Sequence, residues 1–155
     1  DSIWDYPCSC GRCAQVPAVR QPGTAPPTGY DVAMPAVPTF DVVCLCAAWC
    51  RTCEGYRAVF EQVARELADS GVALRPRWVD IEDEADLVGD VEVETFPMLV
   101  IADAHAVRFA GPLTPQPDIL RRLLRATLLA PVADAGWPAV APDIEAFAQR
   151  LRAAP

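Results

Sequence analysis

The stretch "VVCLCAAWCRTCEGY", residues 42–56, holds four of the chain's seven cysteines and decides the fold. Together with Phe40 and Asp41, the first six residues of this stretch form a nearly continuous apolar run at 40–47, which predicts a strand buried on both faces. From Tyr56 onward, apolar residues recur at spacings of three and four, which predicts an amphipathic helix. The pair Cys50 and Cys53 therefore lies where a buried strand passes into a helix.

This placement has chemical consequences for the two cysteines. The first turn of a helix carries unpaired N–H groups and a partial positive charge, which stabilise a thiolate and lower the pKa of a cysteine there. Cys50 stands at that position, and Cys53 lies on the same side of the first turn, where it can attack a mixed disulfide on Cys50. The pattern therefore favours dithiol–disulfide exchange.

Two other interpretations of the pair stay open. Cys50 and Cys53 could be spectators without chemistry, or they could be half of a zinc site, which needs about four ligands. In the zinc case, the remaining ligands would come from Cys8, Cys10 and Cys13, or from His105.

The order of the other elements predicts an α/β domain. The pattern indicates a strand at 72–81, a short acidic helix at 82–89, a hairpin of strands at 98–102 and 107–111, and an amphipathic helix at 117–129. Pro76 has no N–H for a ladder, so it implies a sheet edge or a bulge. The first two strands can form a parallel βαβ unit, to which the hairpin adds antiparallel strands. We take the apolar side of the last helix to be Ile119, Leu120, Leu123, Leu124, Thr127 and Leu128.

Composition divides the chain into three parts. Residues 1–38 form an extension rich in Pro and Ala that contains a cysteine cluster and shows no apolar period, so we expect little regular structure there. Residues 39–130 contain the strongly periodic segments and form the domain. Residues 131–155 form a tail broken by prolines, in which 143–152 indicate one more short helix.

Charge and cysteine count limit the partners and the compartment. The net charge of −8 argues against nucleic acid and anionic membranes as partners, and no apolar run approaches the ~20 residues of a membrane span. An odd number of cysteines argues against a fully disulfide-paired secreted scaffold, so we expect a reducing cytoplasm. Because the chain begins at Asp1 without Met, a cleaved export signal and a periplasmic location remain the alternative.

The motifs together resemble those of the thioredoxin family over residues 40–129. The matching features are the buried strand before "WC", the CxxC pair, "VDIEDEADL" at 79–87 followed by "ETFP" at 94–97, and Gly111 after the second hairpin strand. The resemblance implies a thioredoxin fold, in which helices flank a mixed central sheet and the chain adds N- and C-terminal extensions. It also implies a cis peptide bond between Phe96 and Pro97, and X–Pro is the position where such bonds occur.

The resemblance also implies an activity. The protein would be a protein-disulfide oxidoreductase in which Cys50 attacks and Cys53 resolves, while Trp49 and Pro97 shape the site. Its partners would be protein thiols or disulfides and a reductant or oxidant protein. We expect a monomer with no organic cofactor and no metal. The alternative function is a non-catalytic module of the same fold, which binds a partner or handles metal through its N-terminal cysteines.

The residues between the two cysteines depart from the family. Arg51 and Thr52 stand where thioredoxin usually has Gly-Pro. An arginine beside Cys50 favours the thiolate, and a stabilised reduced form makes the pair a stronger oxidant. We therefore expect a less reducing couple than in a typical thioredoxin.

A second departure concerns the residues beneath the pair. Cys44 replaces a buried Asp that takes the proton from the resolving thiol in the family, and Trp78 aligns with the buried Lys that usually partners this Asp. Cys46 stands where the family commonly has an aromatic residue. Because the family's Asp and Lys are both replaced, neither position leaves an unpaired charge buried in the core. The usual proton acceptor for Cys53 is therefore missing.

The remaining cysteines carry open alternatives. Cys44 and Cys46 lie two apart on a strand and so share a face, poorly placed for a disulfide with each other. They are either small buried hydrophobes or an extra electron relay. Three interpretations of the N-terminal cluster stay open. Its thiols could be exposed and unpaired, they could form a disulfide within the arm or one that exchanges with the CxxC pair, or they could bind a soft metal such as Cu(I). Its members are Cys8, Cys10 and Cys13.

His105 and the acidic residues at 82–86 are interpreted as surface features. His105 stands at the predicted hairpin turn, which indicates a surface residue. The acids at 82–86 are expected to form a solvated helix start, and an acidic surface of this kind could also select partners electrostatically.

Overall fold

A computed structural model describes residues 38–129 and 139–154 of the chain. The chain divides into two units, Asp1–Met34 and Pro35–Pro155, and the described residues all belong to the second. The N-terminal extension and its three cysteines lie outside the described residues.

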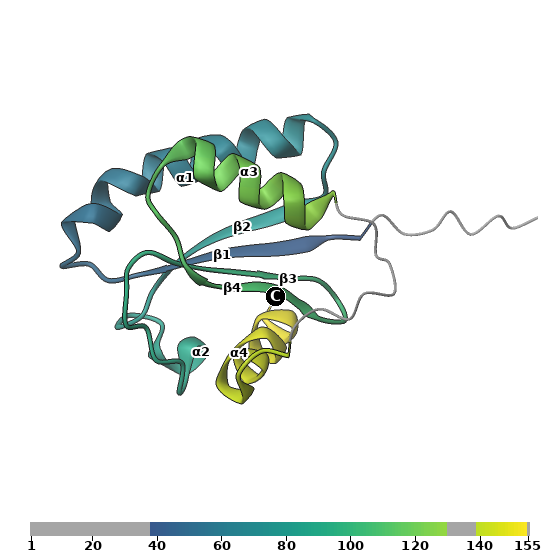
Figure 1. Cartoon of the computed structure of the whole chain (residues 1–155). Helices are drawn as coiled ribbons and strands as arrows, with labels where there is room; N and C mark the ends of the chain where they lie inside the picture. The colour runs from purple at the N-terminus through teal and green to yellow at the C-terminus, as the bar shows by residue number, and fades with distance from the viewer. Residues whose placement is uncertain (1–37, 130–138, 155) are drawn as a thin grey trace, which may run out of the picture. The chain divides into compact units, whose positions relative to one another are not determined.

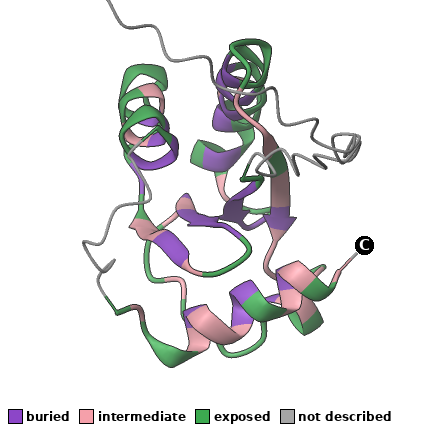
Figure 2. Ribbon diagram, turned by 90° about the vertical axis from the view of Figure 1, so that its right-hand side faces the viewer, coloured by how far each residue is buried: buried purple, intermediate pink, exposed green. Residues whose placement is uncertain are grey.

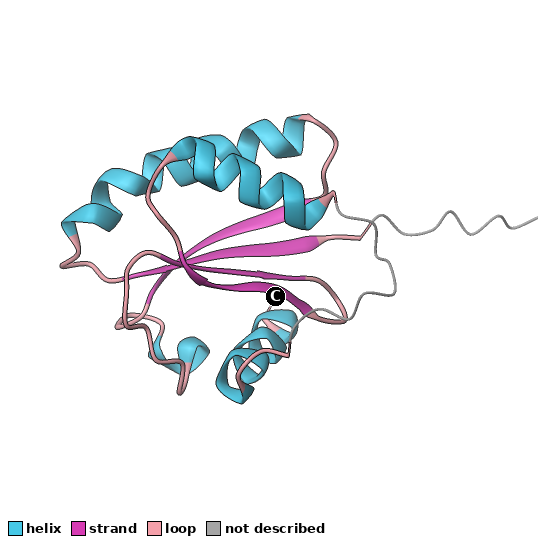
Figure 3. Cartoon of the chain, viewed as in Figure 1, coloured by secondary structure: helices cyan, strands magenta, loops and turns pink. Residues whose placement is uncertain are grey.

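The sheet is mixed, as the sequence predicted (Figures 1 and 3). Its strands lie in the order β2-β1-β3-β4, with β1 parallel to β2 and antiparallel to β3, and β3 antiparallel to β4. The strands are β1 (Phe40–Cys46), β2 (Leu74–Asp80), β3 (Met98–Ala102) and β4 (Val107–Pro112). The helices are α1 (Arg51–Asp69), α2 (Ala85–Val88), α3 (Pro117–Leu128) and α4 (Pro142–Ala153).

Strand β1 is the centre of the domain, and all seven of its residues are buried. Because successive side chains point to opposite faces, its residues supply two cores. Val42, Cys44 and Cys46 belong to the core beneath α1 and α3. Val43 and Leu45 belong to the core on the other face, beneath α2 and α4. Figure 2 shows the buried residues gathered between the helices and the sheet.

Helices α1 and α3 cover the first face through stripes of apolar side chains. In α1 the stripe is Cys53, Tyr56, Phe60, Val63, Ala64 and Leu67. In α3 the stripe runs through Leu120, Leu124 and Leu128 at a spacing of four, with Thr127 beside it. Ile119 was assigned to this stripe from the sequence, and that assignment is wrong: the residue is exposed, because it lies at the margin of the helix face.

Two local features of the βαβ half follow from single residues. Pro76 lies in β2, which is an edge strand, so the edge placement predicted for it is confirmed. The helix predicted at 82–89 is shorter and begins only at Ala85. The reason is that Asp80 accepts hydrogen bonds from the backbone N–H groups of Glu82 (2.9 Å) and Asp83 (3.4 Å), which holds this segment in turns.

The helix indicated near the end of the chain is present as α4, and it packs on the second face of the sheet (Figure 1). Its buried residues are Ile144, Phe147, Ala148 and Leu151. Its arginines also bind the domain: Arg150 donates to the carbonyls of Leu87 and Val88, both at 2.7 Å. Residues of α4 therefore belong to the core on the second face of the sheet.

Candidate active site

The CxxC pair begins helix α1, and its two thiols differ in exposure. Cys50 is the N-cap residue: its N–H donates to the carbonyl of Ala47 (2.9 Å), and its carbonyl accepts from Glu54 (3.1 Å). Its side chain is partly exposed, whereas Cys53 is only 2% exposed. All four cysteines within the described residues are free thiols. An outer thiol that solvent can reach thus stands next to an inner thiol that is shielded.

The loop before β3 lies beside the end of β1, the strand that leads into the cysteine pair. The Phe96–Pro97 peptide bond is cis, as the resemblance implied. Leu45 pairs with Met98 across the β1–β3 ladder, so Pro97 lies beside the last residue of β1. The Pro97 carbonyl accepts from the N–H of Leu113 at 2.9 Å, which ties this loop to the segment after β4.

Trp49 lies over this loop and is 65% exposed. Its ring contacts that of Phe96 edge-on, with centroids 5.4 Å apart and planes at 89°. Edge-to-face contacts of this kind are favourable for aromatic rings. The structure thus brings together Trp49, Phe96 and the cysteine pair, which the sequence placed at one site.

Glu82 is a site residue that sequence reasoning missed. The sequence assigned it to a solvated helix start, but its carboxylate accepts a hydrogen bond from Nε1 of Trp49 at 3.3 Å. The two residues are 33 positions apart, so no local pattern signals the contact. Glu82 therefore holds one edge of the indole while Phe96 contacts its ring.

Arg51 and Thr52, between the two cysteines, are both exposed at the start of α1. Their side chains point away from the core that receives Cys53. The influence of Arg51 on the Cys50 thiolate stays a prediction.

The surroundings of Cys53 disfavour its thiolate. Burial is the main cause that raises the pKa of this thiol, and hydrogen bonds with the thiols of Cys46 and Cys50 raise it further. Cys44 is fully buried and lies opposite Trp78 in the β1–β2 register. Neither residue is an acid, so this pair of positions has no substitute for the Asp that the family has at the position of Cys44. Among the described residues, the buried acids are Asp41 and Asp103, at the far end of the sheet.

Cys44 and Cys46 share one face of β1, as predicted, and their sulfurs lie 3.8 Å apart. The pKa of Cys46 is raised, first by its hydrogen bond with Cys44 and then by burial. The Tyr56 hydroxyl is buried in the same core and has no hydrogen-bond partner among the described residues. Burial and the nearby Cys44 and Cys46 raise the pKa of Tyr56.

Other polar groups do not add to this site. In the part of the chain that the structure describes, no group of three or more His, Cys, Asp or Glu side chains is placed to hold a metal ion. His105 is exposed, as predicted, and its backbone N–H donates to Asp103 at 2.8 Å in the hairpin turn. None of the described helices is both long and apolar enough to cross a membrane.

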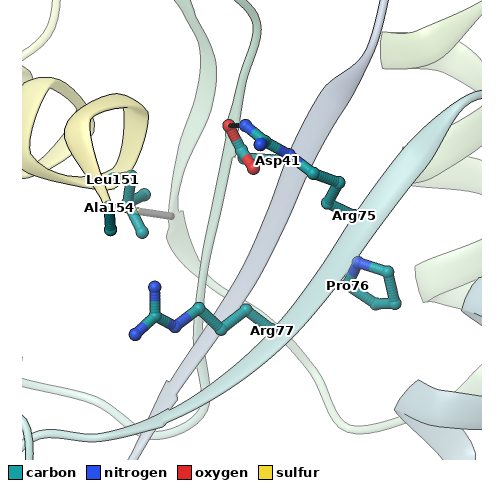
Figure 4. Close-up of a pocket in the computed structure, with 6 residues that line it drawn as sticks. All are labelled: Asp41, Arg75, Pro76, Arg77, Leu151 and Ala154. Carbon is teal, nitrogen blue, oxygen red and sulfur yellow. Dashed lines mark hydrogen bonds and ion pairs between the residues drawn. The ribbon is translucent and has the colours of Figure 1, made fainter.

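Two of the surface cavities among the described residues are lined by charged side chains or lie near the site. One of about 370 Å³ lies between the β2 edge and the end of α4 (Figure 4), lined by Asp41, Arg75, Pro76, Arg77, Leu151 and Ala154. Its charges are already paired, Arg75 with Asp41 at 2.8 Å and Arg77 with Glu84 at 2.6 Å. A second cavity of about 250 Å³ adjoins the Phe96–Pro97 loop and is lined by Glu92, Glu94, Thr95, Met98 and Pro112. Only the second lies next to residues of the candidate site.

Comparisons with known proteins agree with this architecture. A family model described as Thioredoxin matches residues 28–117, more than half of the chain. The first two thioredoxin domains of Eps1p from Naumovozyma dairenensis are similar, with a TM-score of 0.52 and 15% identity, over 72% of this chain and 42% of that one. A protein described only as malarial gives a TM-score of 0.50 and 16% identity, over 58% of this chain and 98% of that one.

A third similar structure is the germline-specific thioredoxin Deadhead from Drosophila melanogaster. It has a TM-score of 0.48 and 15% identity, over 56% of this chain and 78% of that one. No curated protein matches the sequence. At such identities, the likeness of solved structures shows the fold alone.

Proposed function

Because the chain belongs to the thioredoxin family, we propose that it is a thiol–disulfide oxidoreductase that exchanges disulfides with protein thiols through Cys50 and Cys53. The observation that carries the proposal is the unequal exposure of the two thiols at the start of α1. An exchange enzyme needs one sulfur that a protein substrate can reach and a second that acts only on the enzyme-bound intermediate.

The reaction proceeds in two exchanges. The Cys50 thiolate attacks one sulfur of a substrate disulfide, forms a mixed disulfide and releases the other substrate sulfur as a thiolate. Cys53 then attacks the Cys50 sulfur, which releases the second substrate thiol and leaves a Cys50–Cys53 disulfide. The substrate gains two electrons and the enzyme loses two. The direction reverses when a substrate dithiol meets the oxidised pair.

The residues around the pair support docking of a polypeptide. Trp49, held by Glu82 and Phe96, offers an exposed aromatic surface beside Cys50. The cis-proline loop borders the same site. We propose that an extended substrate segment lies between Trp49 and this loop, so that its disulfide reaches Cys50. The partners are then protein substrates and a second redox protein that restores the pair.

The simplest test is reduction of a protein disulfide such as that of insulin, with dithiothreitol as electron source. Wild type should catalyse the reaction, Cys50→Ser should lose at least a hundredfold of the rate, and Cys53→Ser should accumulate a mixed disulfide through Cys50. A Cys8→Ser/Cys10→Ser/Cys13→Ser variant is the control and should keep its activity. If Cys50→Ser were as active as wild type, the role of Cys50 would be overturned. If neither wild type nor Cys50→Ser were active, the proposal would be overturned in favour of a non-catalytic module that acts through its N-terminal cysteines.

We further propose that the couple is less reducing than a typical thioredoxin, because Arg51 and the start of α1 both favour the Cys50 thiolate. Titration against a glutathione buffer should give a potential less negative than the ~−270 mV of thioredoxin. Arg51→Gly should shift it to more negative values. A wild-type potential at or below that of thioredoxin would contradict the proposal. A cytoplasmic location is the accompanying proposal, supported by the odd cysteine count.

A further inference from the structure

Beneath the CxxC pair, the structure contains two more thiols that the exchange reaction above does not use. Cys44, Cys46 and Cys53 are all buried in one core cluster, and Cys50 packs against it. The sulfurs of Cys44 and Cys46 are 3.8 Å apart. The Cys46 and Cys50 thiols both contribute to the raised pKa of Cys53, so they are near neighbours of that thiol. Within this cluster the four thiols therefore form a series in the order Cys44, Cys46, Cys53, Cys50.

The position of Cys46 in this series is fixed by the backbone. Cys46 is the last residue of β1, and its carbonyl accepts the N–H of Ile81 at 2.9 Å. The chain then needs only three residues to reach Cys50, whose N–H binds the Ala47 carbonyl. The end of β1 thus lies directly under the first turn of α1. Cys44 lies one pleat repeat further from that turn, about 6.6 Å along the strand.

We propose that Cys46 is a third redox-active thiol of this site, which takes Cys53 from the Cys50–Cys53 disulfide and thereby frees Cys50. The inference rests on the proposed function, because the substrate disulfide supplies the oxidised pair. The Cys46 sulfur attacks the Cys53 sulfur, a Cys46–Cys53 bond forms, the Cys50–Cys53 bond breaks, and the electron pair leaves on Cys50. The proton lost by Cys46 is balanced by the one that the Cys50 thiolate takes from water, and no net oxidation occurs.

The isomer has a distinct chemical behaviour. Cys50 is again a partly exposed thiol, but its resolving partner is held in the core. A mixed disulfide formed on Cys50 in this state cannot be resolved by Cys53. After the exchange, Cys50 is the thiol that can react with a substrate, and no resolving thiol is available. A substrate that forms a mixed disulfide with Cys50 therefore stays bound until the reverse exchange frees Cys53.

The same surroundings set the rate of this exchange. A buried Cys46 thiol is mostly protonated near neutral pH, and only a thiolate attacks a disulfide. The thiolate fraction rises with pH, so the isomerisation should accelerate as the pH is raised above neutral. Cys44 donates or accepts a hydrogen bond beside Cys46 and influences this rate without joining the disulfide.

The decisive experiment maps disulfides in the full chain. In a background in which Cys8, Cys10, Cys13 and Cys50 are all replaced by Ser, only Cys44, Cys46 and Cys53 remain. Mild oxidation with diamide, which accepts the two electrons, should give a Cys46–Cys53 disulfide and leave Cys44 as the one free thiol, which is alkylated once the oxidised chain is unfolded in urea. A Cys44–Cys46 disulfide, a dimer linked through Cys53, or three free thiols would each overturn the proposal.

Two matched variants in that background complete the test. Adding Cys44→Ala should leave the Cys46–Cys53 disulfide in place, whereas adding Cys46→Ala should abolish it. Cys46→Val serves as a second removal that keeps more of the buried volume, and circular dichroism checks the fold of each. If Cys53 still formed an intramolecular disulfide without Cys46, the assignment of Cys46 would be wrong.

The chain that lacks only the N-terminal cysteines gives the second readout. The Cys8→Ser/Cys10→Ser/Cys13→Ser protein is oxidised and treated with iodoacetamide, and the product with one disulfide and alkylated Cys50 is measured. Its yield should fall at least tenfold in Cys46→Ala, and an unchanged yield would overturn the inference. Disulfide mapping needs no turnover, so failure of the proposed function appears in the insulin assay, while failure of this inference appears only in the maps.

Discussion

At the scale of single residues, Trp49 shows how an exposed aromatic side chain can still be positioned. Although 65% exposed, its ring is contacted by Phe96 and its Nε1 donates to Glu82. A hydrogen bond to a carboxylate is stronger than one to a neutral acceptor. Glu82 therefore fixes one edge of the Trp49 ring, on which the proposed substrate segment would rest.

Glu82→Gln tests this role. Loss of the charged acceptor should lower kcat/KM for a protein disulfide by about two- to fivefold, which corresponds to ~0.5–1 kcal/mol for one exposed hydrogen bond. Activity toward a small disulfide that does not reach Trp49 should not change. Stability should stay within ~0.5 kcal/mol of wild type, because the residue is exposed. The control is the neighbouring Asp83→Asn, and equal losses in both variants would indicate a general charge effect instead.

At the scale of the elements, helices α1 and α3 are joined by an ion pair in addition to their apolar contact. Arg121 donates to both carboxylate oxygens of Glu66, at 2.7 and 3.1 Å, and also to Asp118 at 3.0 Å. The hydrogen bonds from Arg121, followed by that from Gln62, lower the pKa of Glu66 to about 2. The charged form of this carboxylate is thus favoured in the folded chain.

This shift predicts a pH dependence of stability. A carboxylate whose pKa falls on folding stabilises the native state above its unfolded pKa of ~4.3, and the contribution disappears as the pH falls through about 2. Glu66→Gln should therefore lower Tm relative to wild type at pH 6–7, and the difference should vanish near pH 2. Glu61→Gln, which breaks a pair within α1 alone, is the control and should give a smaller difference. A Tm difference that does not change with pH would contradict the prediction.

At the scale of the whole domain, the two faces of the sheet bury different residues. The α1 and α3 face holds all four cysteines of the described residues, and the other face is closed in part by α4. Phe147 of α4 is fully buried against the sheet. Arg152 donates to the carbonyl of Asp103 at 2.9 Å, and Asp103 in turn accepts from Arg108 at 2.7 Å, so α4 is also bound to the β3–β4 turn.

Phe147→Ala should separate stability from chemistry. Removal of a fully buried phenyl ring typically costs about 3–5 kcal/mol, measured by urea unfolding. Below the unfolding transition, kcat/KM for a protein disulfide should stay within twofold of wild type, because the cavity opens on the face without cysteines. Leu129→Ala, at a 61% exposed position, is the control and should cost less than ~0.5 kcal/mol. A large loss of kcat/KM in folded Phe147→Ala would show that the two faces are coupled.

The sequence by itself determined the features that depend on neighbours along the chain. The apolar run of β1, the CxxC pair at the start of α1 and the edge position of Pro76 all follow from local period and from the chemistry of single residues. Tertiary structure decided the features that depend on which distant segments meet. Glu82 reaches Trp49 across 33 residues, Cys46 and Cys53 share one core where a strand ends beneath a helix, and α4 enters the core on the other face. Even Ile119, apolar and in a suitable period, is exposed, because the position of a helix on its sheet selects which edge of an apolar stripe is buried. Register and packing set these contacts, and neither is encoded in the spacing of residues within one segment.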